Sequence, residues 1–195
     1  MQNFDGAELR HLALTGDTVT RQQAFSKLWD GFYRRLVHFA RGWPAIPNDE
    51  RADAATEALL AAFAALASYD PTQAFSAWLF GVARHKFQDA ARHHHQRQWR
   101  QPPLPDDEAE KGAALAWHDD FPERSAAAEL AGQCARAIAG LSGRDRRIAQ
   151  LRFHEELNAS QIGQALGLPA ATVRWRIAAI RRQIQTQLEL LHETA

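Results

Sequence analysis

The chain is poor in cysteine, since Cys134 is the only one among 195 residues. A single thiol cannot form an intramolecular disulfide, which fits a reducing compartment. Its apolar helical neighbours predict a buried, unreactive thiol. Long hydrophobic runs are missing too: no stretch reaches transmembrane length, and the first residues, MQNFDGAELR, lack the apolar core of a signal peptide. We therefore expect a cytoplasmic protein that does not insert into membranes.

Charge of one sign is also missing, because 23 basic residues balance 23 acidic residues. A net charge of zero argues against simple non-specific coating of nucleic acid, although the distribution of charge matters more than its sum. Runs of β-branched residues are absent, alanine is abundant and 46% of the residues are hydrophobic. These features predict an ordered, all-α protein that is long enough for two small helical domains.

Helical periodicity marks several segments of the amino-terminal half. Residues 1–20 predict only a marginal first helix. Stronger apolar stripes predict core helices around residues 25–39 and 55–66. A turn at residues 68–74 contains a proline, which disfavours a helical residue before it, and a third long helix is expected from Phe75 onward.

This third helix changes character over residues 84–100, which read RHKFQDAARHHHQRQWR and include five arginines or lysines, four histidines and one acid. A basic helix that carries Phe87 and Trp99 is suited to backbone phosphates and to stacking on unpaired bases. The next 25 residues are rich in proline and contain seven acids, which predicts a flexible acidic linker rather than a third domain. The expected division is a first domain at 1–100, a linker at 101–125 and a second domain at 126–195.

The most informative stretch is LNASQIGQALGLPAATVRWRIAAIRR at residues 157–182. Asn158 and Gln161 match a capping box at the start of a short helix. Gly167 is suited to end that helix, and Pro169 to the first turn of the next. The second helix has an apolar face and carries four arginines without an acid among them. Two short helices of this kind are typical of a helix-turn-helix that enters the major groove, the alternative being an ordinary helical hairpin with solvated arginines.

The three consecutive histidines at residues 93–95 do not predict a metal site. Neighbouring helical residues point about 100° apart, so their rings cannot converge as an i, i+4 pair can. No cluster of cysteines or carboxylates completes a ligand set. The chain also lacks paired carboxylates with a base, a phosphate-binding loop and a nucleophile elbow. We therefore expect no metal, no cofactor and no catalytic residues, and hence no enzyme.

These segments, in this order, resemble the extracytoplasmic-function (ECF) subgroup of the bacterial sigma-70 family over about residues 20–192. The segment FSAWLFGVARHKFQDAARHHH is similar to the family's region 2, and LSGRDRRIAQLRFHEELNASQIGQALGLPAATVRWRI is similar to region 4. The resemblance implies that the first domain binds core RNA polymerase and opens the promoter −10 element. It also implies that the second domain reads the −35 element in double-stranded DNA.

The resemblance assigns the melted −10 single strand to the turn and the basic helix of the first domain. Flipping a base requires a polar pocket beside an aromatic or apolar wall, and residue types of this kind occur in the turn. The implied −10 residues are Ser68, Tyr69, Asp70 and Phe75 in and beside the turn, Arg84, His85 and Lys86 facing the upstream edge, and Arg92 and Arg97 along the DNA backbone.

In the second domain the resemblance assigns −35 recognition to Thr172, Arg174, Trp175 and Arg176. Both arginines are expected to be exposed and to lack acidic partners. Trp175 is unusual at this position, where small or polar residues are more common in the family. It either packs on a sugar or a thymine methyl group, or it covers the neighbouring helix.

The polymerase-binding acids implied by the resemblance are Asp49, Glu50, Asp53 and Glu57. The family's acidic run is weakened here, because residues 50–53 read Glu-Arg-Ala-Asp. Thr56 occupies a position where the family has glutamine, and a phosphate on it would restore negative charge opposite a basic partner. Control by a Ser/Thr kinase is thus one hypothesis. The alternatives are an anti-sigma factor as the controlling partner and an acidic cluster that suffices by itself.

A stand-alone regulator that binds an operator through the same helix-turn-helix is the competing interpretation. Such a regulator needs a dimer to present two half-sites. It leaves the basic helix at residues 84–100 unexplained.

Overall fold

The computed structural model describes residues 5–100, 132 and 136–193, and every regular element in these ranges is a helix or a helical turn. The prediction of an all-α protein is confirmed. The expected linker at 101–125 and Cys134 lie outside the described residues. In chain order the elements are α1 (Gly6–Thr15), α2 (Thr18–Ala40), α3 (Arg51–Ala64), the 3₁₀ turn η1 (Leu66–Ser68), α4 (Phe75–Arg100), α6 (Gly143–Ala149), the π-helical turn η2 (Gln150–His154), α7 (Ala159–Leu166) and α8 (Ala170–Glu193).

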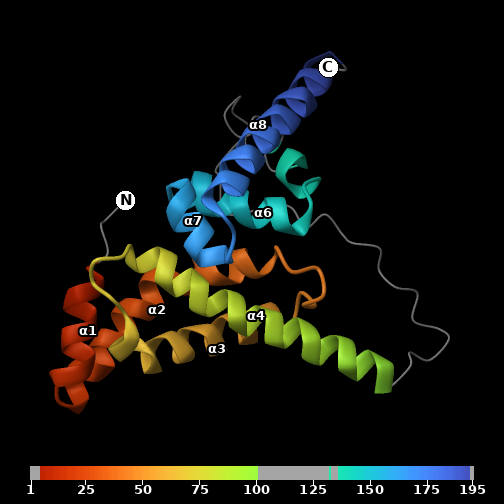
Figure 1. Ribbon diagram of the computed structural model, residues 1–195. Helices are drawn as coiled ribbons and strands as arrows, with labels where there is room; N and C mark the ends of the chain where they lie inside the picture. Colours follow the sequence, from red (N-terminus) through yellow and green to blue (C-terminus); the bar gives the residue numbers. More distant parts are fainter. Residues whose placement is uncertain (1–4, 101–131, 133–135, 194–195) are drawn as a thin grey trace.

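Helices α1 to α4 form the first unit, which Figure 1 shows as a compact bundle. Helix α2 buries one face against α3, and α4 packs on α3 in turn. Aromatic side chains fill the centre: the ring centroid of Phe39 lies 4.8 Å from that of Phe80 and 5.0 Å from that of Trp43. Phe87 is also fully buried and lies 5.1 Å from Trp43. The expectation that Phe87 stacks on unpaired bases is therefore wrong, because this ring belongs to the core.

The first helix is better formed than its short apolar pattern predicts. The side chain of Asp5 accepts hydrogen bonds from the backbone N–H groups of Ala7 and Glu8, at 2.9 and 3.0 Å. Leu9 and Ala13 are buried against the bundle. The cap accepts hydrogen bonds from backbone N–H groups that have no partner within the first turn of a helix. Tertiary packing then stabilises α1, which is short enough to be marginally stable by itself.

Helices α6, α7 and α8 form the second unit, with the helix-turn-helix at α7–α8. The predicted capping box is present: Asn158 Oδ1 accepts from the N–H of Gln161 at 3.0 Å, and Gln161 Oε1 accepts from the N–H of Asn158 at 2.8 Å. Gly167 ends α7 in the left-handed conformation, with φ 65°. Helix α8 begins one residue after Pro169 and buries Val173 and Ile180. The turn geometry therefore follows the prediction closely.

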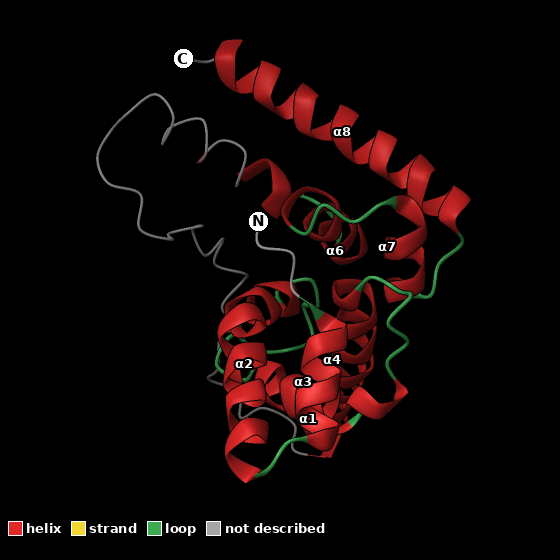
Figure 2. Ribbon diagram, turned by 90° about the vertical axis from the view of Figure 1, so that its left-hand side faces the viewer, coloured by secondary structure: helices red, strands yellow, loops and turns green. Residues whose placement is uncertain are grey.

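The two units pack directly on each other, with α7 lying along α4 (Figure 1). Figure 2 shows the same arrangement from the side, with α6 and α7 above the bundle and α8 projecting away from it. A polar contact at one end of this interface joins Gln164 Nε2 of α7 to Gln73 Oε1, at 2.5 Å. The turn that carries the −10 candidates is thus in contact with α7 of the helix-turn-helix.

Candidate nucleic-acid and polymerase interfaces

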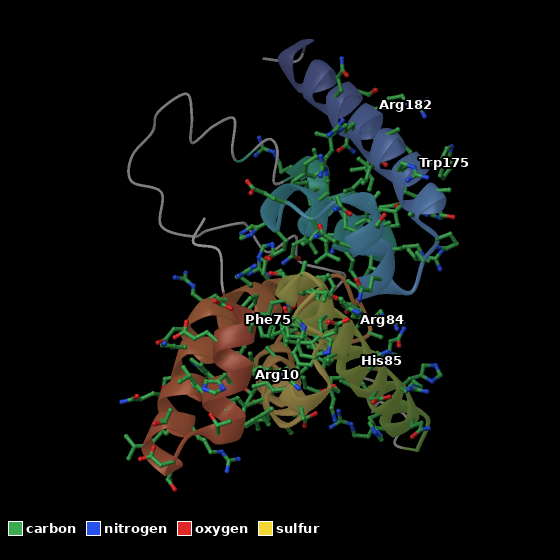
Figure 3. All side chains as sticks on the ribbon, turned by 60° about the vertical axis from the view of Figure 1, so that its left-hand side comes forward. Arg10, Phe75, Arg84, His85, Trp175 and Arg182 are labelled. Atoms are coloured by element: carbon green, nitrogen blue, oxygen red, sulfur yellow. The ribbon has the colours of Figure 1, made fainter. Side chains whose placement is uncertain are left out.

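The amino-terminal end of α8 presents an exposed aromatic and basic surface. Trp175 is 64% exposed and points away from the rest of the unit (Figure 3). Arg174 is exposed beside it, and Thr172 is half-buried one turn earlier. Of the two alternatives for Trp175, a cover over the neighbouring helix does not fit this exposure. The arrangement can present an indole ring and a guanidinium group to a groove of double-stranded DNA.

Arg176 differs from Arg174, although the two are only two residues apart. Its Nη1 atom donates to Asp145 Oδ1 of α6 at 2.7 Å, and both side chains are largely shielded, at 26% and 20% exposure. Ser142 Oγ donates to the other oxygen of Asp145 at 2.8 Å. The expectation that Arg176 lacks an acidic partner is therefore wrong. Asp145 was missed because it lies 31 residues earlier, and no local pattern signals such a pairing.

The turn before α4 has exposed polar side chains on its outer edge, which we call the rim, and two buried aromatic side chains beneath them. Tyr69 is 4% and Phe75 is 5% exposed, and their ring centroids lie 5.1 Å apart at nearly right angles. Tyr69 donates its hydroxyl hydrogen to the carbonyl oxygen of Gln73 at 2.8 Å, and burial raises its pKa. These two residues do not form an exposed wall for a flipped base in this conformation. They anchor the turn that carries the two exposed residues Ser68 and Asp70.

The rim itself is organised by a local hydrogen-bonded turn. Asp70 Oδ1 accepts from the backbone N–H and the hydroxyl of Thr72, at 2.9 and 2.8 Å. These bonds favour the carboxylate and lower the pKa of Asp70. Ser68 donates its hydroxyl hydrogen to the carbonyl of Ala65 at 2.7 Å. Both residues are exposed, so a nucleobase can reach their side chains.

The basic residues of α4 do not all face the same way. Figure 3 shows Arg84 on the side of the second unit, and its Nη2 atom lies 2.9 Å from Nε2 of the exposed His85. Lys86 lines a groove between α3 and α4. Arg92 pairs with Asp89 on the same helix, at a largely exposed position. Only part of the predicted −10 surface is therefore available in this conformation.

Arg97 forms an ion pair with Glu50, the acidic residue that directly precedes α3. Its Nη2 atom lies 2.8 Å from both carboxylate oxygens of Glu50, and His94 Nδ1 lies 3.7 Å from Glu50 Oε1. Arg97, predicted to follow the DNA backbone, is instead in contact with a predicted polymerase-binding acid. The pairing was missed because it joins residues 47 positions apart.

The remaining acids of this surface, Asp49, Asp53 and Glu57, are exposed. Asp53 and Glu57 line the α3–α4 groove together with Glu50. Thr56 is half-buried on the same helix, and its hydroxyl donates to the carbonyl of Ala52 at 3.0 Å, one turn earlier. The surface is thus acidic but partly neutralised from within the protein.

The described residues were compared with the requirements of a metal-ion site and of a membrane-spanning helix. Within residues 5–100, 132 and 136–193, no group of three histidine, cysteine or carboxylate side chains is placed to hold a metal ion. Among the helices in these ranges, none combines the length and apolarity needed to cross a membrane.

Two family models match the chain. One, described as Sigma-70 region 2, matches residues 28–98, and the other, described as Sigma-70, region 4, matches residues 137–186. Among similar proteins, the RNA polymerase sigma factor CnrH of Cupriavidus metallidurans is 27% identical over 169 residues, which cover 86% of this chain and 88% of the relative. The ECF RNA polymerase sigma-E factor of Escherichia coli K12 is 27% identical over 176 residues, with 87% and 89% covered.

Two solved structures are similar in fold. CnrH in complex with the cytosolic domain of CnrY has a TM-score of 0.59 at 24% identity and covers 95% of this chain and 97% of that one. The sigma factor RpoE in complex with the anti-sigma factor NepR from Bartonella quintana has a TM-score of 0.65 at 17% identity and covers 86% and 98%. Both comparisons show the same helical fold.

Proposed function

Because this chain belongs to the sigma-70 family and is related to its ECF members, we propose that it is a sigma factor that binds core RNA polymerase and directs transcription initiation at specific promoters. The observation that carries the proposal is the exposed pair Arg174 and Trp175 on a helix-turn-helix, combined in one chain with a region 2 bundle. The proposed role is regulatory and involves no catalysis by this chain. Its place of action is the cytoplasm, where polymerase and promoters meet.

The second unit would read the −35 element through Arg174 and Trp175. A guanidinium group pairs with the major-groove acceptors of guanine, and an apolar surface contacts the methyl group of thymine. Thr172 would position the helix on the DNA backbone. Arg176 would hold the start of α8 against α6 through Asp145 rather than read a base.

The first unit would capture a base of the −10 element beside the turn at residues 68–74. Ser68 and Asp70 offer polar atoms at the rim, and the buried rings of Tyr69 and Phe75 keep the turn in place. Arg84, His85, Lys86 and Arg92 would contact the strand along α4. Arg97 would join them only when it is released from Glu50.

Core polymerase would bind the acidic side of α3, formed by Asp49, Glu50, Asp53 and Glu57. A basic partner recognises such a surface by charge complementarity, which sets the association rate and specificity. Arg97 and His94 compete for Glu50, so this contact is weakened in the free protein. That competition supports a mode of control that adds negative charge, such as phosphorylation of Thr56 by a Ser/Thr kinase.

We expect Thr56→Glu to raise the affinity for core polymerase, and Thr56→Ala to change it little, when binding is measured without a kinase. Ala64→Glu is a matched control, because it adds the same charge to an exposed position two turns later on α3. If wild-type protein binds as tightly as Thr56→Glu, the phosphorylation hypothesis is wrong. Release from an anti-sigma factor, the type of partner named for the RpoE neighbour, then becomes the better explanation.

In vitro transcription with core polymerase on a library of genomic fragments tests the function as a whole. We expect promoter-specific transcripts that depend on this protein, and stable co-elution of the protein with core polymerase. A stand-alone operator-binding regulator would instead bind DNA as a dimer without polymerase. Operator binding of that kind, without transcripts, would contradict the proposal.

A further inference from the structure

Helix α1 packs against the turn that carries the proposed −10 residues. Figure 1 shows this helix at the edge of the bundle, beside the segment that leads into α4, and it contacts the 3₁₀ turn η1. Its residues, 6–15, precede the stretch matched by the region 2 model, which begins at residue 28. That match does not account for α1, so its contacts have to indicate what it does.

The amino-terminal end of α1 lies on the aromatic side chains beneath the turn. Gly6 is buried, and a Cβ atom built on it would lie 2.7 Å from Cγ of Phe75, closer than real Cβ atoms approach another atom. Only glycine therefore allows the helix to contact this ring so closely. Burial is the first cause of the raised pKa of Tyr69, and the negative charge of Asp5, the cap of α1, is the second. Both rings of the turn are thus within reach of α1.

Arg10 connects α1 to the backbone that leads into the turn. Its Nη2 atom donates to the carbonyl oxygen of Ala67, the residue that directly precedes the rim, at 3.3 Å. The preceding residue of α1, Leu9, is buried in the core and fixes the orientation of the helix. An exposed ion pair of 3.3 Å between Glu8 and Lys27 of α2 also joins α1 to the bundle. The Arg10 guanidinium is therefore held at the point where the rim begins.

Stability alone does not explain an arginine at position 10. The side chain is half-buried, and its Nε atom is buried without a hydrogen-bond partner among the residues that the structure describes. A buried donor in this state costs free energy, whereas an apolar side chain of similar length would cover the same surface without that cost. The hydrogen bond from Arg10 to the turn accounts for the residue better than packing does.

The polar side chains of the rim are bonded only to their neighbours in the chain. Within the described residues, Asp70 accepts hydrogen bonds from Thr72, and Ser68 donates to the carbonyl of Ala65. Extruding a base from the stack costs free energy, and a pocket that is already ordered lowers the further cost of binding that base. A contact from a separate helix is therefore needed to fix where the rim lies before DNA binds.

We propose that Arg10 is a positioning residue for base capture at the −10 element, and that α1 is the helix through which it holds the turn at residues 68–74. Arg10 acts through the carbonyl of Ala67, and Gly6 acts through the ring of Phe75. Neither Arg10 nor Gly6 touches DNA in this role. The inference rests on the proposed function as a sigma factor, and it extends the −10 site to a helix outside the matched region.

Single-stranded −10 DNA with and without the captured base tests this role. The full chain bound to core polymerase is titrated with a fluorescent strand, and a scan of abasic sites with wild-type protein first identifies the captured base. We expect Arg10→Met to weaken binding of the intact strand at least fivefold and to leave binding of the abasic strand unchanged. Arg21→Met, at an exposed position of α2, is the matched control and should change neither. Equal losses on both strands would overturn the positioning role.

Hydrogen exchange of the free protein tests whether Arg10 holds the turn in the absence of DNA. We expect Arg10→Met to speed exchange of the backbone N–H groups of residues 69–74 at least tenfold and to leave α7 unchanged. Arg10→Lys keeps a donor, so it should restore part of the protection and part of the base-dependent binding, which a side chain that only packs would not do. Thermal unfolding monitors folding of both variants. Unchanged exchange in a folded Arg10→Met protein would overturn the proposal.

A second variant tests the contact with Phe75 independently of Arg10. Gly6→Ala adds one atom against the ring, and we expect the same selective loss on the intact strand. Ala7→Ser is the matched control, because it adds one atom at an exposed neighbouring position. Wild-type affinity of Gly6→Ala for the intact strand would remove the Phe75 contact from the proposal. If no abasic site weakens wild-type binding, the proposed base capture itself fails, and hydrogen exchange still decides whether Arg10 holds the turn.

Discussion

For single residues, the partner that a side chain contacts determines its role more than the residue type does. Arg174 and Arg176 are both arginines in the first turns of α8. Only Arg176 meets a carboxylate, Asp145, which is itself held by Ser142. Arg174 remains available for DNA beside Trp175. The two arginines therefore have separable effects on DNA recognition and on stability.

Replacing Arg174 with alanine is expected to weaken −35 binding by about 1–3 kcal/mol, because a base-edge contact is lost. Arg176→Ala is expected to lower the free energy of unfolding by about 1.5–3 kcal/mol, because it removes a hydrogen bond between charged, shielded groups. Footprinting of the −35 element and denaturant unfolding measure the two effects. Asp145→Asn is the control, since it should reproduce the stability loss of Arg176→Ala. A selective loss of base recognition in Arg176→Ala would contradict the assignment.

Tyr69 illustrates a second residue-scale distinction, between anchoring a turn and contacting DNA. Truncating this buried ring to alanine is expected to cost about 3–5 kcal/mol of stability. Tyr69→Phe removes only the hydrogen bond to Gln73 and is expected to cost about 0.5–1.5 kcal/mol. Thermal unfolding measures both effects, and permanganate reactivity of unpaired thymines measures promoter opening. Strand opening that fails in a fully stable Tyr69→Phe protein would show direct contact instead.

At the scale of secondary-structure elements, short helices depend on their caps. Helix α7 has only eight residues, and Asn158 accepts hydrogen bonds from two backbone N–H groups at its start. Isolated helices of this length are unstable in water. The cap and the left-handed Gly167 therefore define where the helix-turn-helix begins and turns.

Asn158→Ala is expected to lower the free energy of unfolding by about 0.5–2 kcal/mol, the usual cost of losing an amino-terminal cap. Denaturant titration followed by circular dichroism provides the measurement. Ser160→Ala is a matched control in the same turn, where the side chain is exposed. Equal losses in both variants would show that the cap contributes nothing specific.

At the scale of the whole molecule, the buried carboxylate between the units makes stability depend on pH. Burial by itself would raise the pKa of Glu155, but hydrogen bonds with His154 and Arg35 outweigh burial and lower it. The Glu155 contribution is therefore present above the ordinary value of 4.5 and is lost as pH falls through the lowered value. Arg35 and His38 of α2 are the charged and titratable groups that face this pair.

The contribution of His154 to stability depends on pH in the opposite direction to that of Glu155. Its hydrogen bond with Glu155 is the main reason that its pKa is raised, so its contribution is full below 6.5 and is lost as pH rises through the raised value. We expect the stability contribution of the pair to be largest between pH 4.5 and 6.5. Thermal unfolding across pH measures it, and Glu155→Gln should flatten the profile. A profile unchanged by Glu155→Gln would contradict this origin.

Features that depend on neighbouring residues could be predicted from the order of the amino acids. Helical periodicity located the apolar stripes of α2, α3 and α8, and capping chemistry located the start and end of α7 at Asn158 and Gly167. These features follow from side-chain periodicity and backbone hydrogen bonding within one or two helical turns. A short stretch of sequence therefore contains the information needed to predict them. The all-α class followed from the same local patterns, whereas the relation to sigma factors followed from the resemblance of two longer segments to regions 2 and 4 of that family.

The pairing of charges and the burial of aromatic rings could not be predicted in this way, because they depend on how the helices pack. The partners Arg176 and Asp145 are 31 residues apart, and Arg35 and Glu155 are 120 residues apart. Phe87 lies within a basic segment, yet its ring packs on Trp43 in the core. Such contacts arise when separate elements meet, and their free energy depends on burial and geometry that no local pattern contains. The docking of the two units is of this kind.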